Sequence, residues 1–272
     1  MARKKKISKR VKGYNIVLIC VLSILLIAMS IVFVTMLFSS KPFYKIESRT
    51  KEIANNKKND KEDYKTIGWV RVQGTNIDYP LYGINKTSKE YPVNESLLWD
   101  LSYDGTYHNV MQVYGHNVQN LGSNPIKHDE TFIRMEELMS FVYFDFAKEN
   151  KYFQITIDGK DYLYKIFAVD FIEVEAVDGY PKKEYSNFEK KLYIDEMKSN
   201  SIYDYDVDVT EKDDIATVIT CTRFFGDRNQ DFLVTGRLVR KNEKVDNYSV
   251  YRNKKYTEEI INVLEGEVDY EK

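Results

Sequence analysis

One stretch without charge limits what the N-terminal part of this chain can become. Residues 14–38 contain no Asp, Glu, Lys, Arg or His and consist mostly of Ile, Leu, Val, Phe and Met. A helix of this length is long enough to cross the hydrocarbon core of a bilayer. A cleaved signal peptide is the alternative, but its apolar region runs only about 7 to 15 residues. The sequence therefore predicts a transmembrane helix over residues 14–38.

Charge is distributed unevenly around this predicted helix. Seven basic residues and no acidic residue lie within residues 1–12, and because the whole chain has a net charge of −2, the remainder carries −9. The basic cluster before the helix predicts a cytoplasmic N-terminus by the positive-inside rule. We therefore expect a single-pass protein of the cell membrane, with a basic cytoplasmic tail over residues 1–13 and an extracellular remainder. The acidic balance of that remainder argues against a nucleic-acid partner.

The part after the predicted helix divides into three regions by composition. Residues 39–64 are rich in Lys, Asn, Asp and Glu, which is typical of a stalk or a peripheral helix. Residues 65–240 carry the hydrophobic patterning that a folded domain needs. Residues 241–272 are predicted to form a charged C-terminal tail, with one short helix over residues 257–264.

Hydrophobic periodicity within residues 65–240 predicts mostly strands. Period-2 alternation indicates strands at 67–72, 77–81, 108–114, 152–157, 162–174, 215–221 and 232–239, with a two-residue turn at Asp158–Gly159. Helical spacing indicates helices over 132–146 and 185–197, the second with Phe188, Leu192 and Ile194 in its apolar set. Many short strands and two helices that do not alternate with them predict a mainly β fold, a closed or partly closed barrel with helical insertions.

A single thiol ends one of these predicted strands. Cys20 lies in the predicted transmembrane helix, so Cys221 is the one cysteine of the extracellular part and has no internal disulfide partner. Exported domains usually pair their cysteines, and an unpaired one is a reactive thiol or half of an intermolecular bridge. A buried cysteine that acts as a small hydrophobic residue is the bland alternative. Its position between a strand and a loop favours Cys221 as a nucleophile.

A nucleophilic cysteine needs a neighbouring base or positive charge, because a free thiol is only a few per cent ionised at neutral pH. His116 follows a buried-looking strand and a glycine, so its ring can face a cleft, and it is the candidate base. A structural histidine is the alternative at this position. His108 and His128 fit structural or solvent-exposed roles better.

Acyl transfer also needs a group that stabilises the developing oxyanion, and arginine suits this role because it stays charged and presents several donors. The arginines near Cys221 in the sequence are Arg223, Arg228 and Arg237, and each of them fits a solvated side chain equally well. One extracellular cysteine and three scattered histidines are too few for a zinc site, and no glycine-rich phosphate loop is present. We therefore expect no metal and no cofactor.

Several motifs, taken in order, resemble those of the class B sortases, which are membrane-anchored cysteine transpeptidases of Gram-positive bacteria. The motifs are Gly68-Trp69-Val70, Gly74-Thr75-Asn76-Ile77-Asp78-Tyr79-Pro80, Val113-Tyr114-Gly115-His116-Asn117 and Val218-Ile219-Thr220-Cys221-Thr222. The similarity covers roughly residues 65–239. It implies a closed eight-stranded sortase barrel as the catalytic domain, and chemistry that needs no metal.

The resemblance also implies a reaction. Cys221 would attack the threonine carbonyl of a Leu-Pro-x-Thr-Gly or Asn-Pro-x-Thr sorting motif in a surface protein and form a thioester. An amine of the peptidoglycan precursor or cross-bridge would then resolve the thioester, with His116 as acid and base. Two alternatives stay open: a catalytically silent wall-binding or scaffold domain on the sortase fold, and a thiol endopeptidase that uses water instead of the amine.

At one position the sequence departs from the family pattern. Class B members usually carry an arginine at the start of the last strand, and the frame set by residues 232–237 puts Asp231 in that place. Arg228 is the nearest substitute and is our candidate for the assisting arginine, with Arg223 as its rival. Asp231 is also the observation that motivates the silent alternative.

Overall fold

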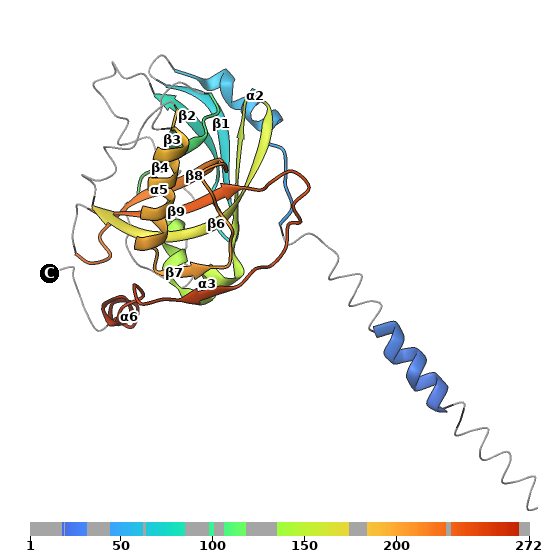
Figure 1. The fold of residues 1–272 in the computed structure, drawn as a ribbon. Coiled ribbons are helices and arrows are strands. Elements are labelled where there is room, and N and C mark those ends of the chain that lie inside the picture. Colours follow the sequence, from blue (N-terminus) through green and yellow to red (C-terminus); the bar gives the residue numbers. More distant parts are fainter. Residues whose placement is uncertain are drawn as a thin grey trace, which may run out of the picture. The chain divides into compact units, whose positions relative to one another are not determined.

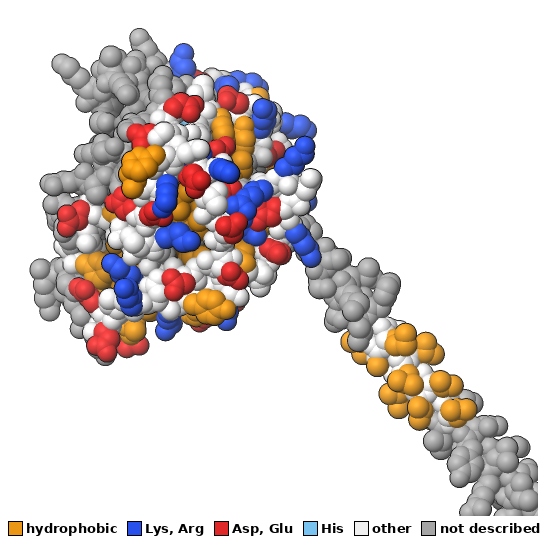
Figure 2. Space-filling view, in the orientation of Figure 1, with side chains coloured by type: hydrophobic (Ala, Val, Ile, Leu, Met, Phe, Trp, Pro, Cys, Tyr) orange, Lys and Arg blue, Asp and Glu red, His pale blue; other side chains and the backbone are white. Residues whose placement is uncertain are grey.

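The computed structural model describes residues 18, 20–31, 44–61, 64–84, 98–100, 106–117, 135–173, 184–226 and 230–266. The chain forms two compact units, Met1–Phe43 and Tyr44–Lys272. In the first unit, residue 18 and residues 20–31 are helical and carry exposed hydrophobic side chains (Figure 2). None of the helices in the described ranges combines the length and the apolar character that crossing a membrane requires. The predicted span over residues 14–38 extends past the described residues at both ends.

The second unit is built mainly from strands (Figure 1). Its strands are β1 (Tyr64–Val72), β2 (Asp78–Ile84), β3 (Leu98–Asp100), β4 (Val110–Gly115), β5 (Tyr152–Ile157), β6 (Lys160–Glu173), β7 (Tyr203–Tyr205), β8 (Ile215–Thr222), β9 (Gln230–Leu238) and β10 (Val250–Arg252). Its helices are α2 (Thr50–Asn56), η1 (Lys57–Asn59), η2 (Glu136–Val142), α3 (Phe144–Glu149), α5 (Asn187–Asn200) and α6 (Glu258–Leu264).

The strands close into a barrel in the order β1-β2-β3-β4-β8-β9-β6-β5. This confirms the predicted mainly β barrel with helical insertions, and eight strands take part in it. Seven strands of six or more residues form most of the wall, and the three-residue β3 fills the place between β2 and β4. Two further short strands of the described residues, β7 and β10, pair in a separate sheet. Two neighbouring pairs, β2–β3 and β4–β8, are parallel.

The barrel interior is a band of branched aliphatic side chains. Val113, Val218, Val234 and Val169 are level with one another on β4, β8, β9 and β6, and all four are fully buried. Burial of one such side chain stabilises the fold by roughly 1.5–3 kcal/mol. Since neighbouring residues of a strand point to opposite faces, the residues next to these valines lie on the outer face of the same sheet.

The hairpin between β5 and β6 confirms the predicted turn. Asp158 and Gly159 both have positive φ, at 52° and 70°, as the common two-residue hairpin turn requires. The single helix predicted over residues 132–146 is wrong. Residues 136–142 form the 3-10 helix η2, and the extended backbone of Tyr143 (φ −80°, ψ 119°) separates it from α3. Every residue of η2 is buried, so its sequence carries no true one-sided pattern.

Helix α5 covers part of the outer face of the barrel sheet. It begins with a capping box in which Ser186 and Glu189 satisfy each other's backbone N–H groups. The Tyr193 hydroxyl lies 2.5 Å from the Thr217 hydroxyl of β8, which fixes the helix on the strand. The predicted apolar face is partly wrong, because Phe188 and Leu192 are 69% and 52% exposed. The buried positions of α5 are Lys190, Tyr193, Ile194 and Met197.

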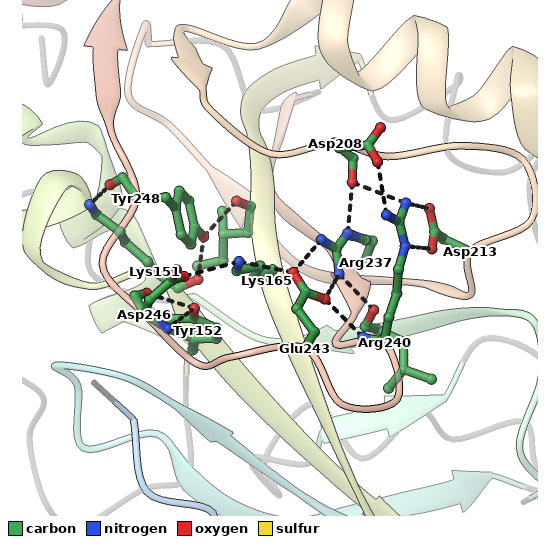
Figure 3. A network of polar contacts seen from close by, with 12 residues as sticks. Lys151, Tyr152, Lys165, Asp208, Asp213, Arg237, Arg240, Glu243, Asp246 and Tyr248 are labelled. Atoms are coloured by element: carbon green, nitrogen blue, oxygen red, sulfur yellow. Dashed lines mark hydrogen bonds and ion pairs between the residues drawn. The ribbon is translucent and has the colours of Figure 1, made fainter. Parts of the chain in front are cut away.

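A polar network holds residues 240–248 against the barrel (Figure 3). Arg237 of β9 forms two hydrogen bonds with Glu243, at 2.5 and 2.7 Å, and Lys165 of β6 bonds the same carboxylate at 3.0 Å. Further along, the Tyr248 hydroxyl lies 2.7 Å from the carbonyl oxygen of Lys151 and 2.8 Å from that of Ile166, and it can donate its one proton to either. Charged side chains of both signs are interspersed over the face seen in Figure 2.

Candidate active site

Cys221 is the next-to-last residue of β8 and is half-buried. Thr217, Ile219 and Cys221 share one face of this strand because side chains alternate. Thr217 contacts α5, so this is the outer face of the barrel. The inward-facing Thr220 donates a hydrogen bond of 2.8 Å to the carbonyl oxygen of Gly115 in β4, which ties the ends of the two strands together. The thiol thus lies on an outward-facing strand end that a buried hydrogen bond fixes.

His116 follows the last residue of β4 and is also half-buried. Strands β4 and β8 are parallel, and the last pair in their register is Gly115 with Thr220. The next positions along the two strands are His116 and Cys221. The topology therefore brings the predicted base and the predicted nucleophile to the same end of two adjacent strands. The His116 carbonyl oxygen accepts a hydrogen bond of 2.8 Å from Met135, which anchors the segment after β4 to the start of η2.

The thiol has a defined hydrogen-bond acceptor. Sγ of Cys221 donates to the carbonyl oxygen of Asn117 at 3.4 Å. Burial raises the pKa of the thiol above its usual range, and the carboxylate of Asp231 raises it further, while hydrogen bonds with Asn117 and Tyr114 lower it. The protonated thiol is therefore the favoured form at neutral pH, and a base must remove its proton during attack.

Asp231 lies directly opposite Cys221 in the pairing of β8 with β9 and is 1% exposed. Its Oδ1 accepts a hydrogen bond of 2.8 Å from the Tyr114 hydroxyl of β4. Burial, followed by the nearby Asp231 charge, raises the pKa of Tyr114 well above its ordinary value, so the phenol stays protonated. A carboxylate, that of Asp231, therefore lies beside the thiol at the position where the resemblance to the class B sortases predicts an arginine. A phenol, that of Tyr114, lies next to it.

An aromatic cluster fixes the turn that follows Cys221. Phe171 of β6 packs against Phe224, Phe225 and Phe232 with ring centroids 4.9–5.2 Å apart. The backbone N–H of Phe224 donates to the Thr222 hydroxyl at 3.0 Å. Contacts of this kind add about 0.5–1.5 kcal/mol each beyond the area they bury. The end of β8 that carries the thiol is therefore fixed by the Thr220 hydrogen bond before Cys221 and by the aromatic cluster after it.

The three candidate arginines have different surroundings. Arg223 is exposed, and its carbonyl oxygen closes the turn by accepting from Gly226 at 2.8 Å. Arg237 pairs with Ile215 at the opposite end of β8 and is bound to Glu243, so it is not placed to assist Cys221. Arg228, our candidate for the assisting arginine, lies outside the described residues, as does His128. His108 is buried at the start of β4, the end of that strand away from His116.

Two residues of this site were not singled out from the sequence. Tyr114 was only part of a motif, although it lies on β4 two residues before His116. Asn117 supplies the acceptor for the thiol, and its buried side-chain amide has no hydrogen-bond partner among the described residues. An unused amide donor near a nucleophile is suited to bind an oxyanion. In the described part of the chain, no three Asp, Glu, His or Cys side chains gather as metal ligands.

Comparison with known proteins gives one consistent relationship. Sortase B of Staphylococcus aureus is 24% identical over 178 residues, which are 64% of this chain and 70% of that protein. Sortase B of Listeria monocytogenes is 24% identical over 228 residues, which are 76% of this chain and 85% of that protein. No protein-family model matches the chain.

Solved structures agree with these relatives. Clostridium perfringens sortase B superposes with a TM-score of 0.54 at 22% identity, over 69% of this chain and all of that chain. The Staphylococcus aureus sortase B–substrate complex superposes with a TM-score of 0.52 at 18% identity, over 72% of this chain and 85% of that chain. The chain thus has a sortase fold, and its sequence resembles that of class B sortases.

Proposed function

We propose that this chain, which resembles class B sortases in sequence and fold, is a cysteine transpeptidase that attaches surface proteins to the cell wall. The observation that supports this most directly is the thiol of Cys221 at the end of β8, beside the end of β4 that leads into His116. A thiol and an imidazole on adjacent strand ends are the two groups that acyl transfer through a thioester needs.

The proposed reaction has two halves. In the first, Sγ of Cys221 attacks the threonine carbonyl of a sorting motif while His116 takes the thiol proton. The carbon–nitrogen bond then breaks, the leaving amine takes that proton from His116, and the acyl group stays on sulfur as a thioester. In the second half, an amine of the peptidoglycan precursor attacks the thioester and gives a proton to His116. The carbon–sulfur bond breaks and Cys221 recovers its proton.

The developing oxyanion needs a donor, and we propose Arg228 for this role, with Arg223 as its rival. The unpartnered amide of Asn117 is a further donor on the same strand end. Alanine substitution of the three residues, one at a time, ranks them. Substitution of the residue that donates to the oxyanion should lower kcat by about 10²–10³-fold, with a smaller effect on KM.

Turnover of fluorogenic peptides with Leu-Pro-x-Thr-Gly or Asn-Pro-x-Thr motifs tests the proposed reaction on the purified full chain. Cys221→Ala should abolish cleavage, because no other group of the site forms the thioester. Cys20→Ala is the matched control, since it removes the other cysteine of the chain and should leave the rate unchanged. Cleavage that survives Cys221→Ala would refute the proposal.

Asp231 favours one alternative, a silent wall-binding domain on the sortase fold. Intact mass spectrometry with a thiol-reactive sorting-peptide analogue separates the two, because a silent domain forms no adduct on Cys221. Product analysis with and without an added amine separates transfer from simple hydrolysis by a thiol endopeptidase. Transfer requires that the amine be incorporated into the product.

We further propose that residues 14–38 anchor the protein in the cell membrane, with residues 1–13 in the cytoplasm and the barrel outside. The uncharged stretch and the basic residues before it support this topology. Membrane fractionation of the full chain and of a variant without residues 1–38 tests the anchor. Protease accessibility of the barrel in intact cells tests the orientation.

A further inference from the structure

Three neighbouring strands contribute one side chain each to a single group at the end of β8. Tyr114 comes from β4, Cys221 from β8 and Asp231 from β9, and β8 lies between the other two strands. The Tyr114 hydroxyl donates to Oδ1 of Asp231 at 2.8 Å. Strands flanking a common neighbour are about 9.5 Å apart, so this bond has to pass over the outer face of β8. Cys221 is the β8 residue opposite Asp231 on that face.

The burial of Asp231 limits what its carboxylate can do. The residue is 1% exposed, so a substrate cannot reach it without a rearrangement of the strand ends. Its influence on the reaction therefore comes from its charge and from the groups that it contacts. One of these is the phenol of Tyr114, which has a single proton to donate. A phenol that donates to a carboxylate cannot at the same time donate to a thiolate.

We propose that Tyr114 and Asp231 form a positioning pair for Cys221, in which the buried carboxylate holds the tyrosine proton and the resting thiol stays protonated and bound to the Asn117 carbonyl. The Asp231 carboxylate, through its charge and by holding the tyrosine proton, thus acts against the thiolate, which is the opposite of what a cation at the same place would do. Asp231 is a positioning residue in this arrangement, since it touches no substrate.

The charges around the thiol support this arrangement. The pKa of Cys221 is raised, mainly by burial and also by the Asp231 carboxylate. Titratable groups of the described residues on the neighbouring elements are Tyr114 of β4, His116 directly after β4, Asp231 of β9, Asp170 of β6, Arg223 of the turn, and Tyr193 and Glu196 of α5. Of these, the Asp231 carboxylate raises the pKa of the thiol, whereas a hydrogen bond with Tyr114 lowers it.

The consequence for the reaction rests on the proposed function. A thiol that stays protonated at rest cannot attack until a base removes its proton, so proton transfer to His116 and the formation of the carbon–sulfur bond have to occur together. A site with a resting thiolate would instead be reactive toward any electrophile at neutral pH. The pair therefore restricts reaction to a bound acyl group held near both residues.

The test is the pH dependence of Cys221 alkylation by iodoacetamide, followed by intact mass in the full chain with Cys20→Ala. Asp231→Asn has nearly the same shape and no charge, so it should move the midpoint down by about one pH unit and speed alkylation at neutral pH about tenfold. Should Asp231→Asn not fold, as judged by circular dichroism, Asp231→Ser removes the same charge. A profile that superposes on that of the parent overturns the proposal.

A double-mutant cycle tests whether the two residues act as a pair. With Asp231 present the tyrosine proton is occupied, so Tyr114→Phe should change the rate less than about threefold. With Asp231→Asn the phenol is released to donate to the thiolate, and Tyr114→Phe should then slow alkylation about tenfold. Equal effects of Tyr114→Phe in the two backgrounds would overturn the pairing.

Asp170→Asn is the matched control. Asp170 is a fully buried carboxyl group on β6, opposite Leu233 of β9 on the same face of the sheet, and its oxygens have no hydrogen-bond partner among the described residues. Its substitution should leave the alkylation profile unchanged, and a shift as large as that of Asp231→Asn would overturn the specific role of Asp231. Alkylation needs no sorting peptide, so a failure of the proposed transpeptidation would leave this result readable.

Discussion

At the scale of single residues, the alternation along β8 separates two tasks. The outward positions carry the thiol and its contacts, whereas the inward Thr220 fixes where the strand ends. Its hydroxyl donates to the Gly115 carbonyl oxygen at 2.8 Å, and Thr220 is fully buried. Since His116 follows Gly115 directly, this bond adds to the backbone pairing of Gly115 with Thr220 in fixing the spacing between the ends of β4 and β8. A substitution that removes this hydrogen bond should therefore affect both the stability of the fold and the alignment of His116 with Cys221.

Thr220→Val keeps the shape of the side chain and leaves the Gly115 carbonyl without its donor. We expect the free energy of unfolding to fall by about 1–3 kcal/mol, measured by urea denaturation. Peptide turnover per folded molecule should also fall, about tenfold or more, because a small displacement of reacting groups is costly.

Thr217→Val is the control for this change because it lies on the same strand. Its hydroxyl contacts Tyr193 at 2.5 Å and Thr235 at 3.1 Å, away from the thiol. The control should lose similar stability but keep its turnover per folded molecule. Equal losses of turnover in the two variants would show that Thr220 has no special role in alignment.

Only some residues of this site can be predicted from the sequence. A thiol at a strand end and a histidine after a glycine are local patterns, so Cys221 and His116 could be proposed without coordinates. The contact of Tyr114 with Asp231 depends on β8 lying between β4 and β9, although the two residues are 117 positions apart. Arg237 was a candidate because it is near Cys221 in the sequence, but the strand carries it to the far end of the sheet.

At the scale of elements, α5 shows which features a local pattern can give. The Ser-x-x-Glu spacing at residues 186–189 marks the helix start, and the capping box is present. The buried face of α5 could not be predicted from the hydrophobic pattern, because Lys190 lies on that face. Its stem crosses the apolar surface and its Nζ donates to the Asp213 carbonyl oxygen at 3.0 Å, while Phe188 remains exposed.

Ser186→Ala should lower the free energy of unfolding by about 1 kcal/mol, since it removes the acceptor for the Glu189 backbone N–H. Thermal and urea denaturation measure the loss. Ser199→Ala is the control near the other end of α5, where the exposed hydroxyl bonds only a carbonyl of its own helix. A loss in Ser199→Ala that matches that of Ser186→Ala would contradict the capping role.

At the scale of the whole molecule, the C-terminal segment is joined to the barrel by contacts that no local pattern displays. Lys165 and Glu243 are 78 positions apart, and Lys151 and Tyr248 are 97 apart. High charge density after residue 240 favours a solvated tail when the sequence is considered alone. In the fold, the same charges meet opposite charges on β6 and β9 (Figure 3). Which charges of the C-terminal segment are solvated and which are paired thus depends on the order of the strands in the barrel, because β6 and β9 supply the opposite charges.

Glu243 joins several groups of this attachment. Its carboxylate accepts from Arg237, Lys165 and the backbone of Arg240, and the Arg237 side chain is only 3% exposed. Glu243→Gln should therefore lower the free energy of unfolding at neutral pH by about 2–3 kcal/mol, because it leaves a buried guanidinium without its counter-charge. Urea denaturation at a series of pH values measures the difference between the parent and the variant.

The pH dependence of that difference has a definite sign. Hydrogen bonds from Arg237 are the main cause that lowers the pKa of Glu243 to about 2, from the usual 4.5. A folded pKa below the unfolded one stabilises the fold above about pH 4.5, and this stabilisation is lost as the pH falls toward 2. The gap between parent and variant should close over this window. The exposed Lys191–Asp195 pair provides the control, because Asp195→Asn removes only a solvent-screened ion pair and should leave the free energy of unfolding nearly unchanged. A gap for Glu243→Gln that stays constant down to pH 2 would mean that the carboxylate charge does not hold the segment in place.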